Sequence, residues 1–185
     1  MSITKLLHSL RTRIEPNPGA DRTTGAPDDE TETVRKIVQQ LDALEPQHAR
    51  YIAAFAYILS RVARADMNIS AEEVGEMERR VMAVGGLPED QAILVVQIAK
   101  SQATLFGGTE NFLVTREFNQ MATHEQKLAL LRCLFAVAAA DQNITPVEDR
   151  EIRQINDELD LRHDEFIAAR IEYSKFLSVL KNTKP

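Results

Sequence analysis

A short pattern occurs twice in this chain, and it limits the folds that the chain can adopt more than any other feature. Residues 63–73 read ARADMNISAEE, and residues 138–148, which start 75 positions later, read AAADQNITPVE. Each copy follows an apolar run and contains Asp, then Asn two residues on, then Ile, Ser or Thr, and Glu. Two interpretations are open: two copies of a helix–loop–helix corner, or two halves of an acidic site.

Each copy carries the residues that start a helix. Ser70 and Thr145 belong to the favoured N-cap types, and Glu73 and Glu148 follow them at the position that closes a capping box. Pro146 stands at the first helical position of the second copy, which proline favours. Capping therefore accounts for both glutamates without any ligand.

The same acids can also form a cation site. Neither copy places carboxylates at the first and third positions of an EF-hand loop, so neither can surround a calcium ion alone. Pseudo-symmetry could bring Asp66 and Asp141 together, with Glu73 or Glu148 joining them, and such oxygens suit Ca²⁺ or Mg²⁺. In the alternative interpretation, each Asp only accepts backbone amides of its own turn.

The composition favours an all-helical protein. The 185 residues are 44% apolar but only 5% aromatic, with 7 Gly and 7 Pro, and no segment alternates between apolar and polar residues as a strand does. We therefore expect an all-α helical bundle of about seven to eight helices with two pseudo-symmetric halves. Each half would pair a buried, Ala-rich helix with a more polar one across its corner.

Three regions are expected along the chain. Residues 1–14 form an amphipathic helix with three basic residues and no acid between them, residues 15–30 form a flexible linker rich in Pro, Gly and charge, and residues 31–182 form the helical domain. The first helix is either a fraying tail or a segment that binds an anionic membrane surface or a partner.

Within the domain, apolar periodicity and stop signals set the helix boundaries. Gly85-Gly86 and Gly107-Gly108 are typical helix ends, and Thr123 with Gln126 forms a capping box. The expected helices cover 31–44, 47–65, 70–84, 88–105, 109–121, 124–140, 146–159 and 163–180.

Charge and cysteine content exclude several classes of protein. The formal charge is −6 and there is no basic stripe, which argues against nucleic-acid binding. No apolar run approaches the roughly 18 residues of a membrane span, and the N-terminus lacks the pattern of a secretory signal. Cys133 lies in an apolar segment, which predicts a buried free thiol in a reducing cytoplasm.

The doubled A-x-A-D-x-x-I-[ST]-x-x-E corner resembles the tellurite-resistance TerB-like family of bacteria and the related N-terminal module of DjlA-type co-chaperones. Residues 116–171, from REFNQ to the FIAAR helix, are similar to TerB-like proteins in order and spacing, and the whole resemblance covers roughly residues 31–175. It implies an all-α fold with internal pseudo-two-fold symmetry.

The resemblance also implies a function. The family acts in resistance to tellurite and other chemical stress, often near the membrane, through complexes rather than catalysis, and its acidic residues are associated with metal. Carried over by position, the metal residues are Asp66, Glu73, Asp141 and Glu148. The family usually has Gly directly after the motif Asp, whereas this chain has Met67 and Gln142, so the turn has either changed or places the following Asn in the left-handed conformation.

Together these observations predict a non-enzymatic TerB-like module in the tellurite and chemical stress response. We expect it to act through protein partners, to be cytoplasmic and peripheral to the inner membrane through residues 2–14, and to bind a divalent cation at its two corners. The alternative is a metal-free structural scaffold or adaptor. A hydrolase that uses the same four acids lacks any sequence signal for a nucleophile or a substrate pocket.

Overall fold

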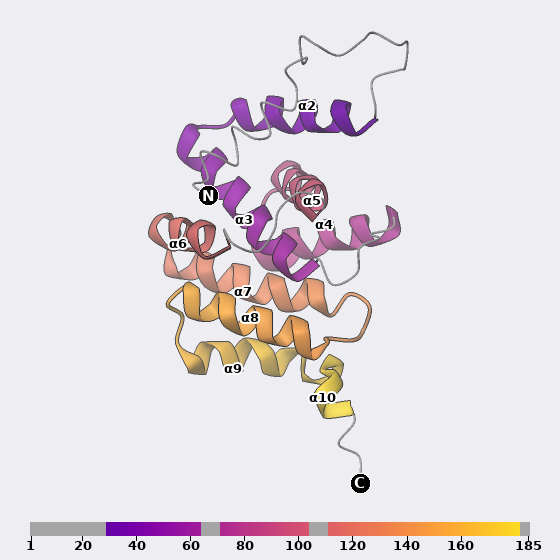
Figure 1. Cartoon of the computed structure of the whole chain (residues 1–185), viewed down its shortest axis with the longest axis vertical. Helices are drawn as coiled ribbons and strands as arrows, with labels where there is room; N and C mark the ends of the chain where they lie inside the picture. The colour runs from indigo at the N-terminus through magenta and orange to yellow at the C-terminus, as the bar shows by residue number, and fades with distance from the viewer. Residues whose placement is uncertain (1–28, 64–70, 104–110, 182–185) are drawn as a thin grey trace.

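The computed structural model describes residues 29–63, 71–103 and 111–181. Within these ranges the chain forms helices joined by short connections, with one isolated backbone bridge, so the predicted all-α class is confirmed (Figure 1). In chain order the elements are α2 (Asp29–Asp42), α3 (Pro46–Ala63), α4 (Ala71–Gly85), α5 (Glu89–Ala103), α6 (Asn111–Met121), α7 (His124–Ala138), α8 (Pro146–Glu158), α9 (His163–Glu172), the 3-10 turn η2 (Ser174–Phe176) and α10 (Ser178–Lys181).

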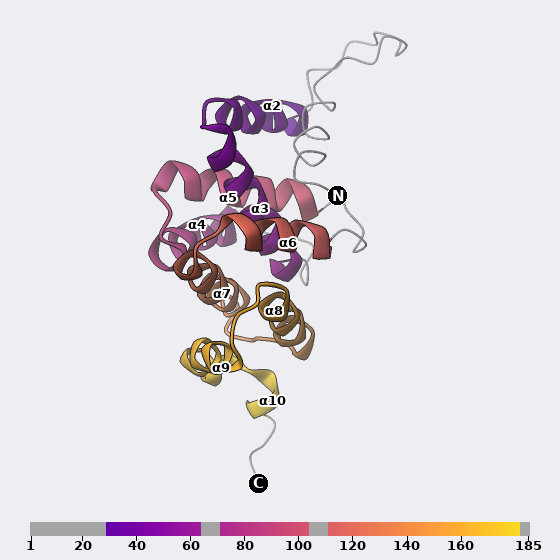
Figure 2. The same ribbon diagram turned by 90° about the vertical axis from the view of Figure 1, so that its left-hand side faces the viewer.

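Helix α3 is the centre of the bundle. Every residue from Tyr51 to Val62 is buried, because the helix is apolar on nearly all sides and must be covered on all of them. It packs against α5, α6, α7 and α8. In two perpendicular views α2 lies at one end of the molecule, and α9 and α10 lie at the other (Figures 1 and 2).

The helix that follows the first corner packs against the helix that precedes the second. We expected α4 to pair with α3 across the first corner, but α4 packs mainly against α7 and α5. It runs antiparallel to α7, since Arg80 donates to the carbonyl of Ala136 while Gly85 lies beside Cys133, nearer the start of α7. Buried Met77 and Val81 form the apolar stripe of α4. Since α3 also packs against α8, helices on both sides of the two corners share one core.

The local signals at helix ends act as the sequence predicts. Helix α4 ends at Gly85, and Gly86 follows with φ of 69°, the left-handed conformation that glycine adopts without strain. Thr123 and Gln126 form the predicted capping box, with the Thr123 amide donating to Gln126 Oε1 over 2.8 Å. The expected stop at residues 107–108 lies outside the described residues.

The prediction of one last helix over residues 163–180 is wrong. Helix α9 ends at Glu172, and the chain continues as η2 and α10. The cause is a pairing with the second corner: the amide of Ile144 donates to the carbonyl of Phe176 over 2.8 Å, and the amide of Ser178 donates to the carbonyl of Ile144 over 3.0 Å. Leu177 is extended between them, so the helix cannot continue.

The predictions for residues 1–14 and most of 15–30 fall outside the described residues, as does the loop of the first corner at 64–70. No helix in the described ranges is both long and apolar enough to span a bilayer.

Candidate functional site

The second corner connects the end of α7 to the start of α8. Asp141 is exposed, and its Oδ1 accepts the amide of Asn143 over 2.9 Å, which is an Asx turn. Glu148 Oε2 accepts both the amide and the hydroxyl of Thr145 over 2.8 Å, and Thr145 Oγ1 accepts the amide of Glu148 over 3.2 Å. Ile144 anchors the loop in the core. Both predicted site acids of this corner therefore hold its backbone.

Gln142 gives the corner its shape. Its φ is 64°, so the residue that replaces the glycine of the TerB-like pattern adopts the left-handed conformation itself. The neighbouring Asn143 does not have positive φ, which excludes the expectation that Asn143 takes over this role in the second copy. A non-glycine residue in this region costs about 1–2 kcal/mol. The turn therefore holds a non-glycine residue in the left-handed conformation at this cost.

The first corner is only partly described. Asp66 lies outside the described residues, and Glu73 lies in the first turn of α4, where the backbone alone is described. Since α4 runs antiparallel to α7, its first turn is on the same side of the molecule as the loop between α7 and α8 (Figure 1). Within the described ranges, no three His, Cys, Asp or Glu side chains are grouped as metal ligands. The four-acid site stays a prediction.

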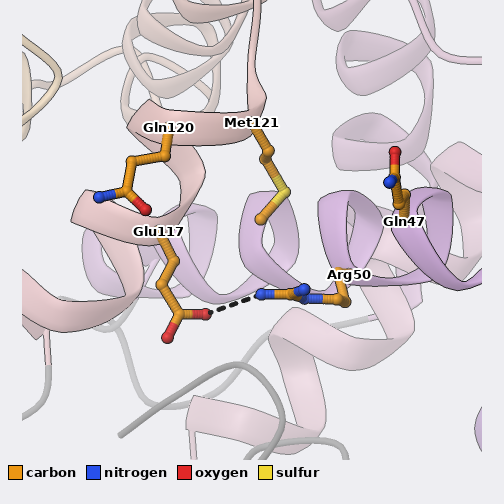
Figure 3. A pocket seen from close by; sticks show the side chains of 5 residues that line it. All are labelled: Gln47, Arg50, Glu117, Gln120 and Met121. Atoms are coloured by element: carbon orange, nitrogen blue, oxygen red, sulfur yellow. Dashed lines mark ion pairs between the residues drawn. The ribbon is translucent and has the colours of Figure 1, made fainter.

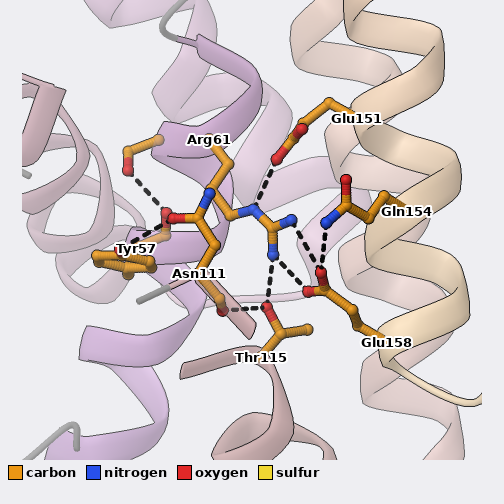
Figure 4. A network of polar contacts seen from close by, with 8 residues as sticks. Tyr57, Arg61, Asn111, Thr115, Glu151, Gln154 and Glu158 are labelled. Atoms are coloured by element: carbon orange, nitrogen blue, oxygen red, sulfur yellow. Dashed lines mark hydrogen bonds and ion pairs between the residues drawn. The ribbon is translucent and has the colours of Figure 1, made fainter. Parts of the chain in front are cut away.

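A buried arginine network, which the sequence analysis missed, joins three helices near the corners. Arg61 of α3 has a fully buried side chain, and its Nε lies 2.7 Å from Glu151 Oε1. Its two terminal nitrogens lie 2.6 Å and 3.2 Å from the oxygens of Glu158, and Nη1 also donates to Thr115 Oγ1 over 2.7 Å. Figure 4 shows the guanidinium enclosed between α3, α6 and α8. A single Arg inside the apolar run of residues 51–63 was the only available signal.

Further hydrogen bonds extend this network in both directions. Thr115 donates its hydroxyl to the carbonyl of Asn111, and the hydroxyl of Tyr57 donates to Asn111 Oδ1 over 3.0 Å. Gln154 donates to Glu158 Oε1 over 2.9 Å. The helix that leads into the first corner is thereby fixed to the helix that leaves the second.

The charges in the network stabilise one another. Burial alone would raise the pKa of the Glu158 carboxyl, but hydrogen bonds and attraction from Arg61 outweigh it, so this pKa lies below its usual value. Burial would likewise lower the pKa of Arg61, while Glu158 and Glu151 together raise it above its usual value. Both groups are therefore charged at neutral pH, which gives the network the strength of charge-assisted bonds.

A second ion pair connects α9 to the start of α8, next to the second corner. Asp149, in the first turn of α8, accepts two bonds from Arg170 of α9, 2.7 Å from Nε and 2.9 Å from Nη2. This bidentate pair orients the end of α9 so that the chain beyond it passes the second corner.

The side chains elsewhere offer little reactive chemistry in the described part of the chain. A shallow pocket between the start of α3 and the end of α6 is lined by Gln47, Arg50, Glu117, Gln120 and Met121 (Figure 3). Arg50 and Glu117 form an ion pair of 3.7 Å across it. Cys133 is a free, fully buried thiol, as predicted, and burial raises its pKa to about 12.

Comparison with known proteins agrees with this architecture. No curated protein and no solved structure matches the chain. The family model of tellurite resistance protein TerB matches residues 51–171, which run from the buried core of α3 through both corners to the end of α9. The chain therefore belongs to the TerB family, a family of tellurite resistance proteins.

Proposed function

We propose that this chain is a non-enzymatic module that acts in the response to tellurite and related chemical stress by binding other proteins. The observation that carries the proposal is the family match over residues 51–171, which includes both corners and the helices that hold them. We further propose that it works in the cytoplasm, with residues 2–14 available for contact with the inner membrane.

Exposed apolar side chains at the second-corner end support a role in protein contacts. Val147 is 68% exposed in the first turn of α8, Ile171 is 63% exposed at the end of α9, and Val179 is 44% exposed in α10. These elements meet at the corner, because Arg170 pairs with Asp149 and the backbone near Leu177 pairs with Ile144. Contiguous exposed apolar surface marks sites of protein association, so we propose these neighbouring elements as the contact surface.

The bonding at the second corner supports a metal-free form of this role. The carboxylate of Asp141 accepts the amide of Asn143, and that of Glu148 closes a capping box, so both acids are accounted for as parts of the fold. In this form the module is an adaptor whose corners serve only to join helices.

Cation binding is the second candidate. It is favoured by the antiparallel packing of α4 on α7, which directs the first turn of α4 toward the side where α7 ends. Glu73 and Asp66 of the first corner would then approach Asp141 and Glu148, and their oxygens could hold Ca²⁺ or Mg²⁺ with water completing the shell. Thermal melts with and without divalent cations separate the two forms.

The stress function is tested by growth on graded tellurite of a host strain that lacks its own TerB protein. The wild-type chain should raise the tolerated concentration, and the triple variant Val147→Ser/Ile171→Ser/Val179→Ser should lose this protection. The control Phe112→Ser/Leu113→Ser changes exposed apolar residues of α6 and should protect like wild type. A wild-type chain that gives no protection would contradict the proposal, and equal protection by the triple variant would remove the second-corner end from it.

A further inference from the structure

The C-terminal strap, residues 174–181, contacts the body of the protein through backbone pairing. Ile144 donates its amide to Phe176 and accepts the amide of Ser178, which forms a parallel bridge between Ile144 and Leu177. The hydroxyl of Ser178 donates to the same carbonyl of Ile144 over 2.6 Å. Three hydrogen bonds thus connect the strap to a single residue of the second corner.

One side chain of the strap is fully enclosed. Leu177 is 1% exposed and belongs to the hydrophobic core, whereas Val179, two residues further on, is 44% exposed. The site that the strap fills therefore has two parts: the amide and carbonyl of Ile144, which bind any extended backbone, and the buried apolar surroundings of Leu177, which favour an apolar side chain.

The strap is held to the body mainly by its pairing with Ile144 and by the burial of Leu177. Among the contacts between the described elements, η2 and α10 pack mainly against each other. The apolar periodicity of residues 163–180 is also compatible with one continuous helix. Pairing with Ile144 interrupts that helix, so release of the strap lets α9 extend in its place. Two arrangements of one segment are the basis of a switch.

We propose that the strap occupies a binding site for an extended segment of a partner protein, and that the partner binds by replacing it. The segment that fits is given by the strap itself: an extended stretch with Leu or a similar apolar residue followed by Ser, which pairs with Ile144 in parallel. The strap keeps the site filled in the absence of the partner. It competes at the high effective concentration of a tethered ligand, so only a well-matched segment displaces it.

This inference rests on the proposed role in protein contacts for the nature of the partner, but the site can be tested on the purified chain. A chain that does not bind the strap peptide could still protect against tellurite. A chain that does not protect against tellurite could still bind the peptide, so the two results are independent.

The probe is a fluorescent peptide of residues 172–182, EYSKFLSVLKN, added to the full-length chain. Leu177→Ser weakens the strap and should bind the peptide saturably, at least about tenfold more tightly than wild type, because the competing segment is removed. Lys175→Ser changes an exposed residue of the strap and should behave as wild type. A peptide that itself carries Leu177→Ser should not bind. A folded Leu177→Ser chain that ignores the wild-type peptide overturns the proposal.

Hydrogen exchange on the wild-type chain decides the question even if Leu177→Ser fails to fold. The amide of Ile144 should exchange at least about tenfold faster than that of Cys133 in the core of α7, because the strap opens without global unfolding. Equal exchange rates for the two amides would mean that the strap leaves only when the whole protein unfolds, which overturns the proposal.

Discussion

Replacing Arg61 with Met tests whether the buried network holds the bundle together. The side chain of Arg61 is fully buried and that of Glu158 is 7% exposed, so the substitution leaves a carboxylate in the interior without its partner. Breaking a buried pair in this way costs about 3–5 kcal/mol. For a domain of this size that corresponds to a fall in Tm of roughly 6–20 °C, since each kcal/mol shifts Tm by about 2–4 °C.

The two glutamates should differ in a matched comparison. Glu151 is 26% exposed and makes one bond to Arg61, while Glu158 makes two and is nearly buried. Glu151→Gln should therefore cost about 1 kcal/mol, and Glu158→Gln about 2–3 kcal/mol. Urea unfolding followed by circular dichroism measures all three variants. The reasoning is refuted if Arg61→Met costs less than about 1 kcal/mol, or if the two glutamine variants cost the same.

The loss of stability caused by Arg61→Met should also depend on pH. The folded-state pKa of Glu158 lies below its ordinary value of 4.5, so its contribution to stability is fully present above that pH and is lost as pH falls through the folded pKa. In Arg61→Met the attraction is gone and burial alone favours the protonated acid. The difference in stability between wild type and Arg61→Met should therefore shrink below pH 4.5. A constant or growing difference would show that Glu158 is not coupled to Arg61.

Three shorter predictions concern the corner and the core. Gln142→Gly should raise stability by about 0.5–1 kcal/mol in thermal melts, because relief of left-handed strain exceeds the entropy that glycine adds to the unfolded chain, whereas Asn143→Gly should lower it. Thr145→Ala should cost about 1 kcal/mol by loss of the cap of α8 and Thr145→Ser should cost much less, so equal losses would mean that the hydroxyl is not the cause. The thiol of Cys133, with its pKa raised to about 12, should react with a thiol reagent only after unfolding in urea, and fast labelling of the native chain would contradict its burial.

Features that depend on neighbouring residues could be predicted from the sequence. The capping boxes at Thr123 and Thr145 and the end of α4 at Gly85 follow from side chains within three or four positions of the helix end. The buried state of Cys133 follows from its apolar surroundings. The family could also be identified, because the repeated corner and its separation are read directly from the residues.

Features that depend on distant residues could not be predicted from the sequence. The break in the last helix requires Ile144, whose pairing with Ser178 joins residues 34 positions apart. The partners of Arg61 lie 54, 90 and 97 positions away, and nothing local distinguishes them from other helix-surface acids. Periodicity gives the helices but not the choice of neighbour, which is why the packing of α4 on α7 was missed.

The two forms of the proposed function differ in what the repeated corner does. It either only joins helices or also binds a cation. The most direct measurement is a thermal melt with and without millimolar Ca²⁺, Mg²⁺ or Mn²⁺, on wild type and on Asp66→Asn/Asp141→Asn. Asparagine at 141 can still accept the amide of Asn143, so the turn should survive the loss of charge.

A folding device predicts no cation-specific rise in Tm for the wild-type chain and nearly equal melts for wild type and variant. A cation present at about 100 times its Kd would instead add roughly 2.7 kcal/mol and raise Tm by several degrees. Such a rise in the wild type, lost in the double variant, would contradict the metal-free account and make the two corners a shared cation site.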